Sequence, residues 1–242
     1  MCKELILSWQ DMKSREWFPV GRLSFDDDRY IFAYTKGALC AKESGFLGLA
    51  GMIDLSKVYY SDIIFPVFQN RILNKSRPDR SDFLSWLNIN LDSYSQFEEL
   101  ARTGGIKATD SLQLYPVPSI ENNKYQVNFF AHGVSHLPKS YKERANNLLV
   151  GEKLYLCADY ENEHDKNALF LRTKDPVEIV GYCPKFFAED FNELFSASKE
   201  SFNINLVKVN TKAPEQLRLL CELSCEWPNG FAPFSKKDFQ LL

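Results

Sequence analysis

Short apolar runs separated by polar turns recur along the whole chain, a pattern that predicts many short strands and few helices. In the first half these runs are residues 5–9, 17–23 and 30–34. A segment with four glycines, residues 36–55, comes next and is expected to be irregular. The first half is therefore predicted to begin with three strands.

Two short helices are predicted in the remainder of the first half. Ser81 or Asp82 can cap a helix that runs to Leu87. Ser93 begins a capping-box pattern for a second helix, which Gly104 should end. The proline- and asparagine-rich segment 115–124 then indicates a connection between domains. We therefore predict an α+β domain at residues 1–118 and a second domain at residues 119–242.

The second half shows the same alternation more densely. The predicted strands are residues 125–132, 153–158, 168–172, 177–182, 202–210 and 217–227. Pro138 can open one helix and Pro184 a second, with Phe187, Phe191, Leu194 and Phe195 facing inward. Many strands with two short helices predict a small barrel, so the chain as a whole is predicted to be α+β and mostly β.

Composition and charge restrict the classes of function. The chain has 45% hydrophobic and 25% charged residues and a net charge of −3. A protein that coats long nucleic acid usually has a basic excess, so any nucleic acid should be gripped over a few nucleotides at a defined site. No apolar run approaches the ~18 residues of a membrane span, and no secretory segment is recognisable, so we expect a cytoplasmic protein without a membrane partner.

The six cysteines show no pattern of a disulfide framework or of a C-x-x-C site. Cys221 and Cys225 fall on the apolar positions of the last predicted strand. We expect both thiols to be buried and chemically inert.

Polar residues concentrate in one connection, residues 160–167, between two apolar runs. Asn162, Asp165 and Asn167 can each turn a side-chain oxygen onto a nearby backbone amide, which predicts a self-stabilised loop. Asp165 could also accept a hydrogen bond from a ligand hydroxyl while repelling a phosphate.

Four motifs in order resemble the HIRAN domain, a module found alone in bacteria and fused to helicase-like remodellers. They are Gly133-Val-Ser-His136, Leu149-Val-Gly-Glu-Lys-Leu-Tyr-Leu156, Asn162-Glu-His-Asp-Lys-Asn-Ala168 and Val180-Gly-Tyr-Cys-Pro-Lys185. The resemblance covers residues 125–227. It implies a six-stranded barrel related to the OB fold that binds the 3′-hydroxyl end of single-stranded DNA, in repair, DNA processing or phage defence.

The motifs assign the family's end-binding roles to particular side chains. Carried over, these are Ser135, His136, His164, Asp165, Tyr182 and Lys185; Lys142, Asn162, Lys166 and Asn167 complete the expected nucleic-acid site. A helicase-linked member of the family has Arg, Tyr and Tyr where this chain has Ser135, His136 and His164. The resemblance therefore implies a weaker phosphate contact, reduced stacking or a changed ligand.

The first half has a weaker resemblance to the N-terminal domain of HipA-type toxin kinases. The residues that carry it are Val20–Phe25, Tyr60–Pro66 and Phe68–Leu73. In that family the domain is non-catalytic, which implies an adaptor that docks on a kinase, helicase or nuclease. An interaction protein in a toxin–antitoxin-like system is the first alternative to DNA-end binding.

The second alternative is a metal-dependent enzyme built on His132, His136 and His164. His132 and His136 have the spacing of a zinc helix but lack the glutamate of H-E-x-x-H, and Gly133 disfavours a helix there. The main prediction is therefore a protein with no catalytic residues, no metal and no cofactor.

A basic cluster stands out in the first half. Arg71, Lys75, Arg77 and Arg80 lie within ten residues of one another. They predict either a solvated loop or a surface that faces an acidic partner or the DNA backbone.

Overall fold

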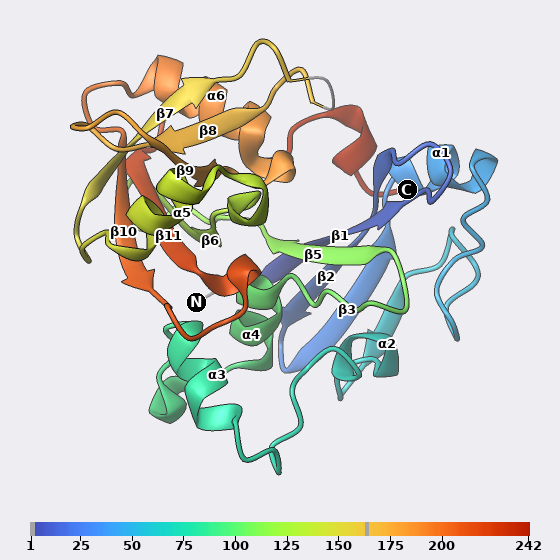
Figure 1. Cartoon of the computed structure of the whole chain (residues 1–242). Coiled ribbons are helices and arrows are strands. Elements are labelled where there is room, and N and C mark those ends of the chain that lie inside the picture. The colour runs from blue at the N-terminus through green and yellow to red at the C-terminus, as the bar shows by residue number, and fades with distance from the viewer. Residues whose placement is uncertain (1–2, 163–164) are drawn as a thin grey trace. The chain divides into compact units, whose positions relative to one another are not determined.

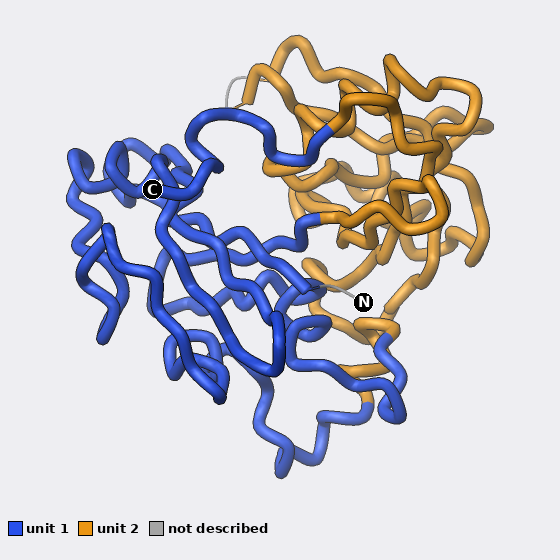
Figure 2. The backbone as a smooth tube through the Cα atoms, turned by 180° about the vertical axis from the view of Figure 1, so that it is seen from behind, with its two compact units in different colours: residues 1–81, 89–117, 232–242 blue, residues 82–88, 118–231 orange. Residues whose placement is uncertain are grey.

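The computed structural model describes residues 3–162 and 165–242. The chain forms two compact units, which Figure 2 distinguishes by colour. Unit 1 comprises residues 1–81, 89–117 and 232–242, and unit 2 comprises residues 82–88 and 118–231. Each unit is built on one antiparallel sheet, which confirms the predicted α+β, mostly β class.

Unit 1 contains a five-stranded sheet with the order β4-β3-β2-β1-β5, drawn from blue to green in Figure 1. Its strands are β1 (Glu4–Gln10), β2 (Trp17–Asp26), β3 (Arg29–Tyr34), β4 (Tyr59–Ser61) and β5 (Leu112–Pro116). Its helices are α1 (Gly37–Glu43), α2 (Pro66–Gln69) and α4 (Gln96–Thr103). The core is a cluster of aliphatic and aromatic side chains in which Leu5, Val20 and Phe32 are fully buried. Burial of such side chains is the main contribution to the stability of the unit.

Local details of unit 1 differ from the sequence-based expectations. The segment predicted to be irregular contains α1, and β5 begins at Leu112, just before the predicted connection. Ser95, not Ser93, caps α4, because its Oγ accepts a hydrogen bond from the amide of Phe97 at 3.2 Å. Gly104 ends α4 as predicted, in a left-handed conformation with φ +66°.

Residues 232–242 return to unit 1 after the chain has completed unit 2, and Figure 1 shows this red segment beside α1. The amide of Lys36 donates to the carbonyl of Gln240 at 2.8 Å, and the amide of Leu242 donates to the carbonyl of Tyr34 at 3.0 Å. The ring of Phe234 packs edge-on against Tyr115, with 5.2 Å between centroids. The last residues of the chain are thus part of the fold of the first unit.

Unit 2 contains a six-stranded antiparallel sheet with the order β6-β11-β10-β7-β8-β9. Its strands are β6 (Lys124–Phe130), β7 (Lys153–Ala158), β8 (Leu169–Arg172), β9 (Ile179–Tyr182), β10 (Asn203–Val209) and β11 (Leu219–Glu226). Its main helices are α5 (Lys139–Asn146) and α6 (Ala188–Ala197). A bridge between His132, just after β6, and Tyr182 of β9 links the two ends of the strand order. The predicted six strands and two helices are confirmed.

The core of unit 2 follows the predicted periodicities with one exception. Cys221 and Cys225 are buried, and burial raises the pKa of the Cys221 thiol to about 12. Phe187 and Phe191 are buried and their rings stack at 5.3 Å. The side chain of Phe195 is 38% exposed, so the prediction that it faces inward is wrong. It lies one turn beyond Phe191 and packs edge-on against Phe202 at 5.2 Å.

Helix α3 (Arg80–Trp86) crosses the division between the units, because residues 82–88 group with unit 2. Lys208 Nζ donates to the carbonyl of Ser85, and Asn210 Nδ2 donates to the carbonyl of Trp86 at 2.9 Å. A fragment that begins at residue 119 would lack this segment. The division into domains at residues 1–118 and 119–242 stays a prediction.

Two of the four residues of the basic cluster, Arg71 and Arg80, have largely buried side chains. The Arg71 side chain is 2% exposed and pairs with Asp110 at 2.6 Å. Arg80 is 11% exposed and pairs with the buried carboxylate of Glu99 at 3.2 Å. The hypothesis that the cluster faces a partner or DNA is therefore wrong for these two arginines, because each satisfies an acidic group of its own unit.

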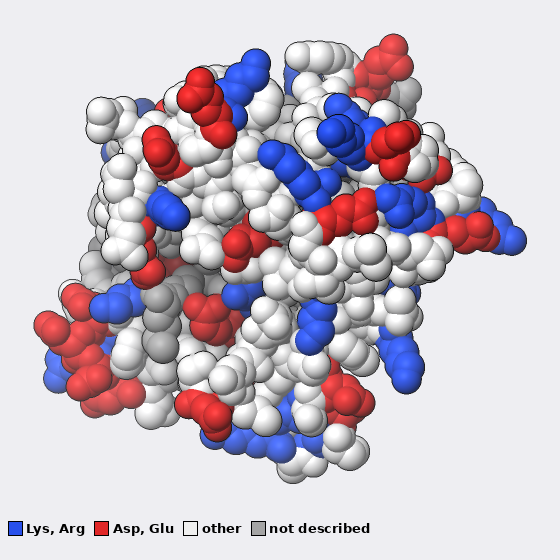
Figure 3. All heavy atoms as spheres, turned by 90° about the vertical axis from the view of Figure 1, so that its left-hand side faces the viewer, with Lys and Arg blue, Asp and Glu red and all other residues white. Residues whose placement is uncertain are grey.

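No described helix is long and apolar enough to cross a membrane. On the face of the molecule that Figure 3 shows, acidic and basic side chains are interspersed.

Candidate functional site

The bridge that links the two ends of the unit 2 strand order positions the candidate site. His132 and Tyr182 exchange two backbone hydrogen bonds, of 2.8 and 2.9 Å. Gly133 follows in a left-handed conformation with φ +70°, and a Cβ on it would lie 3.1 Å from Cδ2 of Tyr182. Only glycine combines this conformation with such a close approach at low cost. The seam, defined here as residues 132–136 together with Tyr182, therefore depends on Gly133.

The polar loop between β7 and β8, residues 159–168, lies next to the seam and is held by its own side chains. Asn162 Oδ1 accepts from the amide of Asp165 at 3.0 Å, and Asp165 Oδ1 accepts from the amide of Asn167 at 3.0 Å. These are the turns that the sequence predicted for Asn162 and Asp165. Asn167 acts differently, because its Nδ2 donates to Glu189 Oε1 on α6 at 3.1 Å.

Asp159 joins the loop to the seam. One of its oxygens, Oδ2, accepts from Asn162 Nδ2 at 3.0 Å and from the hydroxyl of Tyr182 at 3.1 Å. Burial, and then the Asp159 carboxylate, raise the pKa of the Tyr182 hydroxyl. The ring of Tyr182 is half-buried and meets Phe170 edge-on at 6.4 Å. Asp159 thus holds Tyr182 and the loop in one arrangement.

The structure brings several of the predicted residues together and leaves others at the edge. Asn162, Asp165 and Tyr182 belong to the single network around Asp159. Ser135 and His136 are exposed on the 3-10 turn Val134–His136, which directly follows Gly133 and contacts β9.

The three predicted lysines lie on different elements. Lys142 is half-buried on α5, a helix that contacts both β9 and the turn of Ser135. Lys166 is exposed on the loop, and Lys185 is exposed three residues after Tyr182. His164 lies outside the described residues. Two of the three lysines are thus exposed, and all three belong to unit 2.

Three side chains of the site were missed by the sequence analysis. Asp159 and Glu189 were missed because Tyr182 and Asn167, which connect them to the site, lie 23 and 22 positions away in the chain. Tyr160, in the loop, is 91% exposed. An aromatic residue between two acidic residues in a polar segment was the available signal, because such a ring has no apolar neighbour in the sequence to pack against.

The described residues contain no group of three or more histidine, cysteine, aspartate or glutamate side chains placed to hold a metal ion. Burial lowers the pKa of His132, whereas His136 is exposed on the following turn. The proposed set of three histidines includes His164 and is therefore not tested as a whole.

The carboxylate of Asp165 can accept a further hydrogen bond. Its Oδ1 is taken by the amide of Asn167, and its Oδ2 receives no hydrogen bond from any described residue. Asp165 is half-buried, so part of the residue remains accessible from outside the loop. The arrangement can accept one hydroxyl donor and discriminate against an anion at the same position.

Unit 2 is thus a small six-stranded barrel with a polar loop at its seam. Residues 124–228 match the family model of the HIRAN domain. This stretch of the chain is therefore a HIRAN domain, as the four sequence motifs predicted.

A solved structure with a similar chain is the crystal structure of the HIRAN domain of human HLTF. It has 13% sequence identity and a TM-score of 0.32, and the similarity covers 44% of this chain and 81% of that chain. No curated protein matches the chain.

Proposed function

We propose that unit 2 binds the 3′-hydroxyl end of single-stranded DNA at its seam, without catalysis. The observation that carries the proposal is the carboxylate of Asp165, in which Oδ1 accepts from the amide of Asn167 and Oδ2 accepts from no described residue. A hydroxyl can donate to that oxygen in a charge-assisted bond, whereas a terminal phosphate would bring two anions together. One fixed side chain then suffices to recognise the end.

The neighbouring residues fit the rest of a DNA end. Unstacked bases can stack on the exposed rings of His136 and Tyr160, as aromatic side chains do in proteins that bind single strands. Lys142, Lys166 and Lys185 can meet the few phosphates that precede the end. The net charge of −3 agrees with a short binding site rather than a coating surface.

The proposal predicts that oligonucleotides with a 3′-hydroxyl bind at least about tenfold more tightly than the same oligonucleotides with a 3′-phosphate. The penalty combines a lost charge-assisted hydrogen bond of ~1.5–3 kcal/mol with repulsion between two anions. Fluorescence anisotropy with a label in the middle of the strand measures both affinities. Asp165→Asn removes the charge and keeps an acceptor, so it should narrow the gap between the two ends.

The matched control is Glu200→Gln, which removes an exposed carboxylate of the same unit and leaves the loop untouched. It should preserve the full preference for the hydroxyl. Equal binding of hydroxyl and phosphate ends by the unaltered protein would refute the proposal. A strong preference for one 5′ end over another would also contradict it.

Tyr160 supplies a second prediction. Its side chain is 91% exposed, so Tyr160→Ala should leave the fold intact and remove a stacking surface of ~1–3 kcal/mol per base. We expect roughly tenfold weaker binding for hydroxyl and phosphate ends alike, because stacking does not read the end. Tyr60→Ala, at an exposed tyrosine of unit 1, is the control and should bind as the unaltered protein does. An unchanged affinity of Tyr160→Ala would exclude this ring from the interface.

An adaptor role for unit 1 is a second proposal. In it, the HipA-like residues 1–118 dock on a protein partner such as a kinase, helicase or nuclease, in DNA repair, processing or phage defence. The observation that favours a docking role is the apolar groove described next.

A further inference from the structure

One loop of unit 1, residues 44–56, exposes large apolar side chains although its backbone is firmly held. Leu47 is 86% exposed and Ile53 is 75% exposed. Between them, the amide of Leu49 donates to the hydroxyl of Tyr34 at 2.8 Å, and that hydroxyl donates to the carbonyl of Met52. Tyr34 is 1% exposed, and its burial raises the pKa of the hydroxyl to about 12. A buried anchor thus presents Leu47 and Ile53 in fixed positions.

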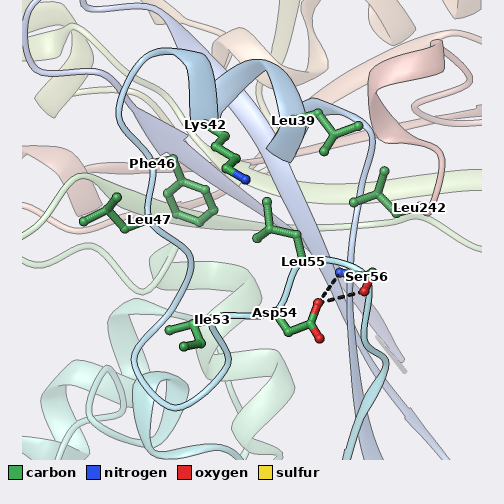
Figure 4. A pocket seen from close by; sticks show the side chains of 9 residues that line it. All are labelled: Leu39, Lys42, Phe46, Leu47, Ile53, Asp54, Leu55, Ser56 and Leu242. Carbon is green, nitrogen blue, oxygen red and sulfur yellow. Dashed lines mark hydrogen bonds between the residues drawn. The ribbon is translucent and has the colours of Figure 1, made fainter.

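The loop separates two hollows in the surface of unit 1. The first, of about 510 Å³, is shown in Figure 4, and its apolar lining consists of Leu39, Phe46, Leu47, Ile53, Leu55 and Leu242. The second, of about 630 Å³, shares Phe46 and Leu47 with the first and extends to Trp9 and Met12. The two hollows adjoin at Phe46 and Leu47 and are lined mainly by apolar side chains, and together they are called the groove.

The groove contains one positive charge without a partner. The ammonium group of Lys42 points into the first hollow in Figure 4, and no described residue forms an ion pair or hydrogen bond with it. The acidic residue of the first hollow, Asp54, is turned to Ser56, whose amide and hydroxyl donate to its Oδ1 at 3.0 and 2.7 Å. The acidic residue of the second hollow, Asp110, pairs with Arg71 at 2.6 Å. A carboxylate bound in the groove would therefore meet the ammonium group of Lys42.

We propose that this groove docks an amphipathic peptide segment of a partner protein. Two large apolar side chains of the segment would occupy the two hollows on either side of Leu47, and an aspartate or glutamate would pair with Lys42. Exposed apolar patches on a pre-organised surface are typical of protein–protein interfaces, because little ordering entropy is lost on binding. Two adjoining hollows that share Phe46 and Leu47 fit a chain with spaced side chains better than one compact ligand.

The test starts from a random 12-residue peptide library displayed on phage. The library is selected on the immobilised full chain and depleted on the Leu47→Asp variant, whose thermal melting should match that of the unaltered protein because the site is exposed. We expect the enriched peptides to share two large apolar residues and one acidic residue. Failure to enrich any peptide over the Leu47→Asp variant would overturn the proposal.

Synthetic versions of the enriched peptides then test the groove residue by residue, with affinities measured by fluorescence anisotropy. Ile53→Asp should weaken binding at least tenfold, whereas Ile63→Asp should not, although Ile63 is equally exposed at 74% and lies in the same unit. Lys42→Glu should weaken binding at least fivefold. A peptide with lysine in place of its acidic residue should regain that loss on the Lys42→Glu variant.

Two results would contradict the proposed occupant. If Lys42→Glu does not change the affinity of the peptides, the proposed pairing of a peptide carboxylate with Lys42 is wrong. Self-association of the full chain in light scattering, lost in Leu47→Asp, would assign the groove to a second copy of the chain. Binding of DNA ends is measured on the same variants and should be unchanged, so the outcome here is separate from that at the unit 2 seam.

Discussion

Arg80→Met is expected to lower the free energy of unfolding of unit 1 by about 3–5 kcal/mol, the usual cost of breaking a buried ion pair on one side. The Glu99 carboxylate is 1% exposed and also accepts from the amide of Leu73 at 2.6 Å and from the hydroxyl of Tyr94 at 2.8 Å. Without Arg80, these two neutral donors face a buried charge that has lost its cation. Urea denaturation followed by tryptophan fluorescence measures the change.

Arg77→Met is the matched control. Arg77 lies three residues away and pairs with Asp79 at 2.6 Å, but both side chains are about half exposed. Exposed ion pairs contribute little to the free energy of unfolding because water and salt screen them. This variant should therefore unfold at the same urea concentration as the unaltered protein. Equal destabilisation by the two substitutions would mean that burial of the Arg80–Glu99 pair is not what gives it its importance.

Gly133→Ala is expected to destabilise unit 2 by about 2–3 kcal/mol and to weaken binding of DNA ends. The substitution forces alanine into the left-handed region, at a cost of about 1–2 kcal/mol, and places a methyl group 3.1 Å from the ring of Tyr182. Tyr182 must then move, which disturbs its hydrogen bond to Asp159 and the loop beyond. Denaturation and anisotropy on the same sample separate the two effects.

Gly151→Ala is the control that separates the cost of the left-handed conformation from the effect of the close contact with Tyr182. Gly151 is in the same unit with φ +86°, and a Cβ there would meet no atom within 4 Å. It should show the conformational cost alone and bind DNA ends normally. If the two variants are equally stable and bind equally well, the approach of Gly133 to Tyr182 has no consequence for the site.

Most strands of this protein were predictable because their signal is local, whereas β4 and β5 were not predicted. In β11, apolar residues at alternate positions place Cys221 and Cys225 on one face, and a strand has a period of two whatever it pairs with. Helix α1 was missed because three glycines follow it within the same segment and the whole segment therefore read as irregular. The prediction that Phe195 faces inward failed because the helical period shows which face of α6 is apolar. It does not show how much of that face neighbouring elements cover.

In the candidate site, likewise, only contacts between residues close in sequence were predictable. The turns of Asn162 and Asp165 involve residues two or three positions apart, so the side-chain chemistry of the loop was enough. The bond of Tyr182 to Asp159 joins residues 23 positions apart and depends on how β7, β8 and β9 pair. Arg71 was misread for the same reason, since its partner Asp110 is 39 positions away. A cluster of charges in sequence does not reveal which of them are neutralised in the fold.

The return of residues 232–242 to unit 1 has a consequence for synthesis of the protein on the ribosome. Domains generally fold in the order in which they emerge, the N-terminal one first. Here every residue of unit 2 is synthesised before the segment that pairs with Tyr34 and Lys36. The nascent chain can therefore complete its second unit while its first still lacks a part. A premature stop codon after residue 231 would leave the HIRAN domain whole and damage the unit with which translation began.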